Sequence, residues 1–228
     1  MQNHPHCLFV AATAAEASVL GTGSGLPAGH YPDLLAPGIS LLITGVGLSA
    51  TAFWLGKVLA THPYRRVINI GLAGSFDEQL VPGTLVEVVR EEFGDLGAES
   101  PDSFLSLFEM GLAAADEAPF RDGFLYPVET GLAGLGLPKV FGASVNLVHG
   151  QAESIASFKR RSSAQVESME GAAFVYACTL SRIPSLQVRA ISNFVESRRR
   201  GNWKITEALE AMRTFLGIHH GLITGASS

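Results

Sequence analysis

The sequence predicts a single α/β domain whose sheet is covered by helices on both faces. Of its 228 residues, 47% are hydrophobic and 16% are charged, so the chain can bury a large core. Short apolar or β-branched runs recur along it, and stretches with helical spacing lie between several of them. Some runs are uninterrupted, as at residues 41–43 and 67–70, which is typical of strands covered on both faces by crossover helices.

The predicted strands coincide with these runs. We expect strands at residues 7–12, 39–44, 66–71, 84–89, 139–142, 144–148 and 186–192. Two regions rich in Gly, Pro or turn residues, 21–38 and 116–137, are expected to form loops around a site. The alternation of strands and helices resumes after each of them, so residues 1–228 are predicted to form one domain.

The predicted helices lie between or after the strands. In the last of them, apolar residues recur at a spacing of three to four and make one buried face. These residues are Ile205, Leu209, Met212 and Leu216. We expect helices at residues 48–61, 101–113, 153–161, 171–182 and 203–219.

Composition argues against several classes of function. The formal net charge is −5, whereas nucleic-acid-binding proteins normally need a basic face. Cys7 and Cys178 cannot make a disulfide framework, and no charged leader segment precedes Lys57, so we expect a reduced, cytoplasmic protein. Residues 34–56 carry no charge and are long enough to span a membrane. A strand-like run, a glycine turn and a helical pattern divide them, so no membrane segment is expected.

A glycine turn raises the question of a nucleotide cofactor. Residues 45–50 match the pattern G-x-G-x-x-A between a predicted strand and a predicted helix. No Asp or Glu occurs between Asp33 and Asp77, so the acid expected to bind the cofactor's ribose is absent. The turn could still border a substrate or water pocket with its backbone N–H groups. The seven His residues are scattered, and we predict neither an organic cofactor nor a metal.

Three polar residues are expected to meet at one edge of the sheet. Glu16 follows the first predicted strand, Glu170 precedes a predicted helix, and Asn193 ends the last predicted strand. Ligands of open α/β sheets bind at the carboxyl edge, where these three would gather. Glu16 and Glu170 could instead be helix N-terminal acids stabilised by the macrodipole. Their convergence with Asn193 favours a functional site.

The segments around these residues resemble a known superfamily over nearly the whole chain. The purine nucleoside phosphorylase and methylthioadenosine nucleosidase superfamily is similar at Glu16 and at residues 71–75, 165–173 and 188–193. Within it, the futalosine hydrolase family is most similar at residues 144–150, at residues 191–198 and at Trp203. The resemblance implies a phosphorylase/hydrolase-like, single-domain, three-layer α/β/α sandwich with a mixed, largely parallel central sheet.

The resemblance also implies a reaction. It would be hydrolysis of the N-ribosidic bond of futalosine, an inosine-like nucleoside with a benzoate-bearing 5' group, releasing hypoxanthine and dehypoxanthine futalosine in menaquinone biosynthesis. Glu16 would activate the attacking water as general base. Glu170 would bind the ribose hydroxyls and favour the cationic sugar, against which Met169 would pack. Asn193 would hold the leaving base.

Other substrate contacts are implied in the same way. Leu147 would replace an aromatic residue that stacks on the purine, and Val148 would offer backbone groups to its edge. Ala73 and Gly74 would line the substrate site. Arg198 could pair with the benzoate carboxylate or be merely solvated. In the same region, the Trp at position 203 could pack at the start of the last helix or stack on the benzoate.

Two departures from the superfamily bear on the reaction. Methylthioadenosine nucleosidases usually carry Asp where this chain has Asn193, so a 6-oxopurine is expected rather than a 6-aminopurine. Phosphorylases need cations for phosphate, and no Arg precedes Arg65, which favours hydrolysis. A distant Arg, or one from a partner subunit, would restore the phosphorylase alternative. A third alternative is a non-catalytic nucleoside-binding protein, against which the presence of both Glu16 and Glu170 argues.

The resemblance further implies assembly. Members of the superfamily are generally dimers or larger, often with a neighbour's loop over the substrate. We therefore expect a homodimer or larger homo-oligomer, with residues 101–127 as the candidate for the loop that covers a neighbour's substrate.

Overall fold

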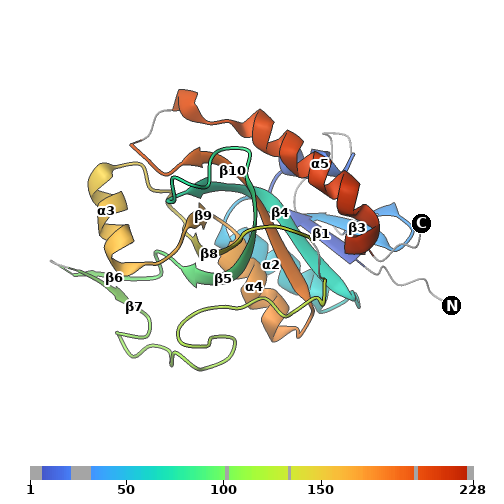
Figure 1. Cartoon of the computed structure of the whole chain (residues 1–228). Helices are drawn as coiled ribbons and strands as arrows, with labels where there is room; N and C mark the ends of the chain where they lie inside the picture. Colours follow the sequence, from blue (N-terminus) through green and yellow to red (C-terminus); the bar gives the residue numbers. More distant parts are fainter. Residues whose placement is uncertain (1–6, 22–31, 101–102, 133–134, 198–199, 225–228) are drawn as a thin grey trace.

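One sheet joins most of the strands of the chain (Figure 1). The computed structural model describes residues 7–21, 32–100, 103–132, 135–197 and 200–224. The strands are β1 (Cys7–Ala11), β2 (Asp33–Ala36), β3 (Ile39–Ile43), β4 (Arg66–Ser75), β5 (Leu85–Phe93), β6 (Gly97–Ser100), β7 (Ser103–Ser106), β8 (Lys139–Ser144), β9 (Val166–Ser168) and β10 (Ser185–Phe194). The helices are α1 (Ala14–Ala17), α2 (Leu48–Leu59), α3 (Ala152–Arg161), α4 (Gly171–Leu180) and α5 (Ile205–Thr224), with short 3-10 turns at Ser18–Leu20 and Arg200–Asn202.

The sheet is mixed and largely parallel, as predicted. Its order is β10-β5-β8-β9-β4-β1-β3-β2, and β10 also pairs with β4. Strands β10, β5, β8, β9 and β4 therefore close into a ring, from which β1, β3 and β2 extend as an open sheet. The pairs β1–β3, β1–β4, β4–β10, β5–β8 and β8–β9 are parallel, whereas β2–β3, β4–β9 and β5–β10 are antiparallel.

Helices cover both faces of the sheet, which gives three layers (Figure 1). Helix α5 packs one face through Ala208, Met212, Phe215 and Leu216, against side chains such as Phe9 and Ile68. Helices α2 and α4 pack the other face, where Leu55 and Phe174 meet Leu8, Val10 and Val67. Successive residues of β1 alternate between these two clusters, as the period of two in a strand requires. A third apolar cluster, including Val86, Val140 and Ile191, lies among the ring strands.

The prediction of a helix at residues 101–113 is wrong. Ser103–Ser106 form strand β7, which pairs with β6 in an antiparallel hairpin. A tertiary contact accounts for this, because the Arg161 guanidinium of α3 lies 4.0 Å from the centre of the Phe104 ring. Gly97 allows the two strands to approach, since a Cβ there would fall 2.1 Å from the carbonyl oxygen of Leu105. Such contacts override local helical spacing.

Other differences from the prediction are smaller. The two strands expected at 139–142 and 144–148 are one strand, β8, which ends at Ser144. Part of the expected loop 21–38 is strand β2, and β9 was not predicted. The last helix runs further than expected, to Thr224. Among the described residues, no helix is long and apolar enough to cross a membrane.

Candidate active site

A cavity of about 320 Å³ opens where β1, β4 and β10 end. Because these three strands are parallel, their carboxyl ends meet at one edge of the sheet. The lining includes seven of the predicted site residues: Glu16, Ala73, Gly74, Val148, Met169, Glu170 and Asn193. The convergence expected at this edge is therefore present in the fold.

Glu16 is held rigidly at the cavity wall. It is the third residue of α1, where it forms a capping box with Thr13. Its Oε2 accepts hydrogen bonds from Thr13 N at 3.0 Å and Thr13 Oγ1 at 2.8 Å, and its Oε1 accepts one from Leu72 N at 3.0 Å. Glu16 is thus a helix N-terminal acid and a cavity residue at once. Only Oε1 keeps a vacant acceptor site for a further donor.

Glu170 lies between β9 and α4, of which it is the N-cap residue. Its Oε1 accepts a hydrogen bond from the backbone N–H of Gly47 at 2.9 Å. Gly47 has φ +97°, a backbone conformation that side chains other than glycine's disfavour. The glycine turn thus presents its N–H to a protein carboxylate.

The pKa of Glu170 is raised above its ordinary value. Burial is the main cause, since the residue is only 6% exposed. The Arg189 charge and the backbone N–H groups of Gly47 and Met169 lower this pKa, whereas the nearby Glu16 charge adds to the rise. Among the causes that lower this pKa, the charge of Arg189 is the largest.

That cation, Arg189, was not singled out from the sequence. It lies on β10, is 1% exposed, and donates from Nη2 to Asn69 Oδ1 at 2.6 Å. A Cβ on Gly71 would fall 2.2 Å from Arg189 Nη1 and 2.8 Å from Glu16 Oε1. The guanidinium and the Glu16 carboxylate therefore crowd the same glycine. A charged residue inside the apolar run at residues 188–191 was the available signal.

Asn193 of β10 also lines the cavity. Its Oδ1 accepts a hydrogen bond from Ser192 Oγ at 2.7 Å, and its Nδ2 donates to the Phe194 carbonyl at 2.8 Å. These neighbours set the orientation of the amide. One N–H and one lone pair remain vacant. The amide lies over Gly74, where a Cβ would be 3.2 Å from Nδ2.

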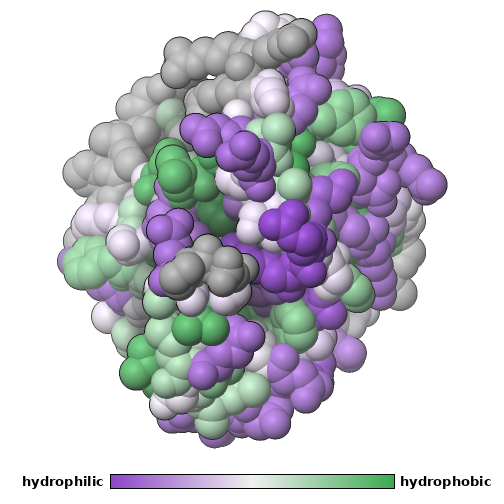
Figure 2. Space-filling model, turned by 90° about the vertical axis from the view of Figure 1, so that its left-hand side faces the viewer, coloured by the Kyte–Doolittle hydropathy of each residue, from purple (hydrophilic) through white to green (hydrophobic). Residues whose placement is uncertain are grey.

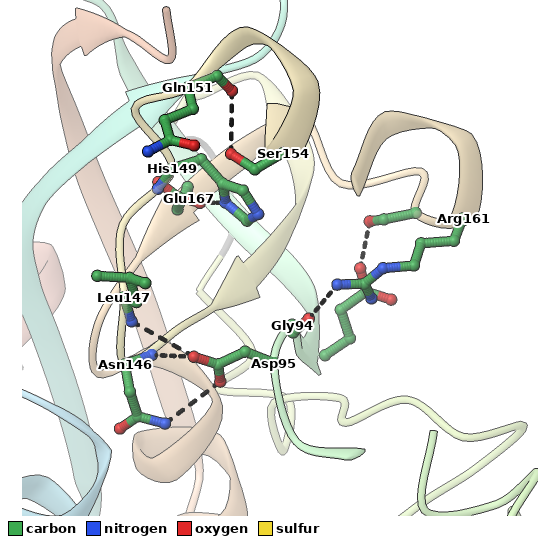
Figure 3. Close-up of polar contacts among 11 residues, drawn as sticks. Gly94, Asp95, Asn146, Leu147, His149, Gln151, Ser154, Arg161 and Glu167 are labelled. Carbon is green, nitrogen blue, oxygen red and sulfur yellow. Dashed lines mark hydrogen bonds and ion pairs between the residues drawn. The ribbon is translucent and has the colours of Figure 1, made fainter. Parts of the chain in front are cut away.

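Leu147 lies elsewhere than predicted. It is 80% exposed and borders a neighbouring groove between α3 and the β6–β7 hairpin, not the cavity. Its backbone N–H donates to Asp95 Oδ2 at 3.3 Å, and Asn146 N donates to the same oxygen at 2.6 Å (Figure 3). These contacts also end β8 before residue 148. Figure 2 views this side of the molecule, which is hollowed near its centre.

The remaining predictions concern contacts to the 5' group of the substrate. Arg198 lies outside the described residues. Trp203 lines the cavity together with Ile205 and Leu209 of α5. Two polar residues that were not predicted, His149 and Glu167, line it as well.

Neither cysteine is among the described residues that line the cavity. Cys7 and Cys178 are buried and unpaired. Burial raises the pKa of the Cys7 thiol to about 12 and also raises that of Cys178. Both therefore remain protonated, unreactive thiols near neutral pH.

Comparisons with known proteins give consistent matches. Residues 33–225 match the family model of the phosphorylase superfamily. The futalosine hydrolase of Thermus thermophilus is 32% identical over 187 residues, which cover 80% of this chain and 81% of that protein. The futalosine hydrolase of Streptomyces coelicolor is 32% identical over 198 residues, which cover 85% and 81%.

Solved structures match the fold. The 5'-methylthioadenosine/S-adenosylhomocysteine nucleosidase of Helicobacter pylori, with butyl-thio-DADMe-Immucillin-A, has a TM-score of 0.77 at 15% identity, covering 98% of this chain and 99% of that one. The native futalosine hydrolase of Helicobacter pylori has a TM-score of 0.71 at 14% identity, covering 94% and 98%.

Proposed function

Because this chain belongs to the phosphorylase superfamily, we propose that it hydrolyses the N-ribosidic bond of futalosine, the substrate named in its 32% identical relatives. One observation carries the proposal. A single cavity brings two buried carboxylates, Glu16 and Glu170, together with the Asn193 amide. Cleavage of an N-ribosidic bond needs groups for water, sugar and base, and these three residues supply them.

Glu16 is the group suited to water. The vacant acceptor site of its Oε1 takes a proton from a water molecule as the water oxygen bonds to the anomeric carbon. The electron pair of the N-ribosidic bond moves onto the purine, which gains a proton at N7. The purine takes that proton from a solvent water molecule, and Glu16 returns the proton it accepted to solvent, so the protons balance. Thr13 and Leu72 fix the carboxylate, so its orientation costs little entropy during the reaction.

Glu170 is the group suited to the sugar. Gly47 occupies one acceptor site of Oε1, and the remaining lone pairs of the carboxylate can accept hydrogen bonds from ribose hydroxyls. Its negative charge stabilises the positive charge that develops on the sugar. Arg189 limits the repulsion between Glu170 and Glu16. Met169 lies beside Glu170 in the cavity wall and supplies apolar contact to the sugar.

Asn193 is the group suited to the base. Its vacant N–H donates to O6 of a 6-oxopurine, and its vacant lone pair accepts from N7–H as the base leaves. A 6-aminopurine would present N–H donors to the amide N–H, leaving a polar group unpaired at a cost of about 1–3 kcal/mol. We therefore propose hypoxanthine as the base released, with Val148 at its edge and Ala73 and Gly74 beneath it.

The charge of the cavity favours hydrolysis over phosphorolysis. No Lys or Arg side chain is among its described lining residues, and Arg189 is buried beneath them. Among the described lining residues, a phosphate dianion would meet the Glu16 and Glu170 carboxylates and no Lys or Arg side chain. Neutral water meets no such repulsion.

The setting of the reaction follows from the same proposal. Release of hypoxanthine from futalosine would place the protein in menaquinone biosynthesis. Two buried, unpaired thiols suit the cytoplasm. A homodimer or larger homo-oligomer would cover exposed apolar side chains of the segment 101–127, of which Leu112 is 70% exposed.

Product analysis tests the proposal. The protein is incubated with futalosine, inosine and methylthioadenosine, each with and without phosphate, and the released base and sugar are identified. We expect hypoxanthine and a free sugar from futalosine at a rate that phosphate does not change. A requirement for phosphate, with a sugar 1-phosphate as product, would contradict hydrolysis. Release of adenine in preference to hypoxanthine would contradict the choice of base.

A further inference from the structure

Three residues of neighbouring strands lie in one row across the floor of the cavity. Glu167 of β9 pairs with Gly74 of β4, and Gly74 pairs with Asn193 of β10. Residues paired in register point to the same face of a sheet. Glu167 and Asn193 therefore flank the glycine on the face that lines the cavity.

The spacing of these three residues leaves room for a planar base between Glu167 and Asn193. Neighbouring strands lie about 4.8 Å apart, so the backbones at Glu167 and Asn193 are separated by about 10 Å. Gly74 between them has no side chain, and a Cβ there would crowd Asn193 Nδ2 at 3.2 Å and Val195 Cγ2 at 2.8 Å. The Asn193 and Val195 side chains fill the space over this glycine, so a planar base in the cavity would lie against them, with Asn193 on one side and Glu167 on the other.

Glu167 is a buried carboxylate that His149 holds in place. It is 4% exposed. Its Oε1 accepts a hydrogen bond from the His149 backbone N–H at 3.1 Å, and its Oε2 accepts one from His149 Nδ1 (Figure 3). The imidazole packs on the Phe158 ring, with 4.8 Å between ring centres. Each carboxylate oxygen keeps a vacant lone pair.

We propose that Glu167 is a second base-reading residue, which accepts the N1–H of a 6-oxopurine while Asn193 binds O6 and N7. In such a purine, O6 lies between N7 and N1 on the ring perimeter, so groups on opposite sides of Gly74 can reach both neighbours. A carboxylate can only accept hydrogen bonds. N1 of a 6-aminopurine carries a lone pair and repels it. The inference rests on the proposed function for its substrate class.

A change from Glu167 to Gln keeps the size and shape of the side chain and replaces one hydrogen-bond acceptor with an NH2 donor. The His149 backbone N–H keeps the amide oxygen in the place of Oε1, and the amide NH2 takes the place of Oε2, where one N–H donates to His149 Nδ1 in its other tautomer and the second N–H faces the base. That NH2 opposes the N1–H of hypoxanthine and suits the N1 lone pair of adenine. Glu167→Gln is therefore expected to reduce the ratio of hypoxanthine to adenine affinity by at least roughly tenfold.

The experiment measures Kd values of hypoxanthine and adenine by calorimetry, alongside kcat/KM for futalosine and its 6-amino analogue. The matched control is Glu92→Gln, whose carboxylate lies outside the cavity and binds Ser162. We expect its Kd ratio to equal that of the unchanged protein. The unchanged protein should also bind 1-methylhypoxanthine at least roughly tenfold more weakly than hypoxanthine, because methylation removes the N1–H. This arm needs no variant and holds if Glu167→Gln fails to fold.

The outcomes separate the two proposals. A hypoxanthine-to-adenine affinity ratio reduced at least roughly tenfold in Glu167→Gln, without any futalosine turnover by the unchanged protein, supports base reading and contradicts the hydrolase. Turnover of futalosine with equal base ratios in both proteins, or unweakened binding of 1-methylhypoxanthine, overturns the role of Glu167. Failure of the unchanged protein to bind either base overturns the role of Glu167, and failure to turn over futalosine as well overturns both.

Discussion

Glu16 and Glu170 differ in how their carboxylates are held, and the difference matches their proposed tasks. Three donors from Thr13 and Leu72 fix Glu16, as a base that must meet one water molecule requires. Gly47 binds one oxygen of Glu170 and leaves the remaining lone pairs of the carboxylate for hydroxyl groups. The two carboxylates are therefore not interchangeable.

Removing either charge is expected to reduce turnover. Glu16→Gln loses the proton acceptor, and Glu170→Gln loses the charge opposite the cationic sugar. Each should reduce kcat by roughly 10²-fold or more, since terms of this kind are typically of that size. Steady-state rates with futalosine measure the loss, and circular dichroism checks folding. Glu210→Gln, at an exposed position of α5, is the control. Near-normal kcat in a folded variant would remove that residue from its role.

Arg189 should set the lower pH limit of activity. Its charge lowers a Glu170 pKa that burial has raised. Without the cation the ionised form of Glu170 is less stable, its pKa rises further, and activity is lost at a higher pH as the solution is acidified. Arg189→Met should therefore move the acidic limb of the profile of kcat/KM against pH to higher pH. Arg189→Lys keeps the positive charge, so its acidic limb should lie close to that of the unchanged protein. An unmoved limb in Arg189→Met would show that the cation does not control Glu170.

At the scale of elements, strand β4 brings the site together. It is bordered by β1, β9 and β10, and its glycines at 71 and 74 leave room for side chains of those neighbours. Gly71 accommodates Arg189 and Glu16, and Gly74 accommodates Asn193. The spacing between strands, together with these two glycines, determines where the charged groups lie.

Gly71→Ala tests this role of the strand. The added methyl group would meet Arg189 Nη1 at 2.2 Å and Glu16 Oε1 at 2.8 Å, so both groups must move. We expect kcat to fall at least roughly tenfold, because a displacement of about 1 Å can cost more than that. Gly56→Ala is the matched control, since its Cβ meets nothing within 4 Å inside α2. It should leave kcat unchanged and stabilise the fold by about 0.5–1 kcal/mol. Equal kcat values for the two variants would contradict the role of Gly71.

At the scale of the whole molecule, a buried carboxylate links the sheet to α4. Glu91 Oε1 accepts from Gln187 Nε2 at 2.6 Å, and its Oε2 accepts from Ser144 Oγ at 3.0 Å. Ser144 Oγ in turn accepts from Ala172 N at 2.8 Å, at the start of α4. Burial raises the pKa of Glu91 from 4.5 to about 7, against the opposing hydrogen bonds of Gln187 and Ser144 and the charge of Arg189.

This pKa makes stability depend on pH. Between pH 4.5 and about 7 the folded protein keeps a proton on Glu91 that the unfolded chain has lost. The free energy of unfolding therefore falls as pH rises through this range, by up to about 3 kcal/mol from this residue. Glu91→Gln cannot ionise and should remove that part of the slope. Urea unfolding of both proteins at several pH values measures it. Parallel pH dependences would contradict an ionisable Glu91 in the fold.

The spacing of apolar residues along the sequence predicted the last helix and the central strands of the sheet. The spacing of Met212 and Leu216 identified the buried face of α5, and the apolar runs identified β1, β3 and β4. The hairpin of β6 and β7 depends on the contact between Phe104 and Arg161, which no local spacing reports.

Some residues of the site could also be predicted from the sequence, whereas others depend on the assembled sheet. Glu16, Glu170 and Asn193 follow or precede predicted elements, so their meeting at one edge could be expected from the sequence. Arg189 and Glu167 reach the site through their registers with Gly71 and Gly74. Register depends on the assembled sheet, and a shift of one residue would turn either side chain to the other face.

The most direct test of the central claim asks which molecule attacks the sugar. Futalosine is converted by the protein in water enriched in the heavy oxygen isotope, with phosphate present, and the sugar product is analysed by mass spectrometry. If Glu16 activates water, the sugar carries one heavy oxygen at the carbon that held the base, and no phosphate. A sugar 1-phosphate without the label would contradict the account.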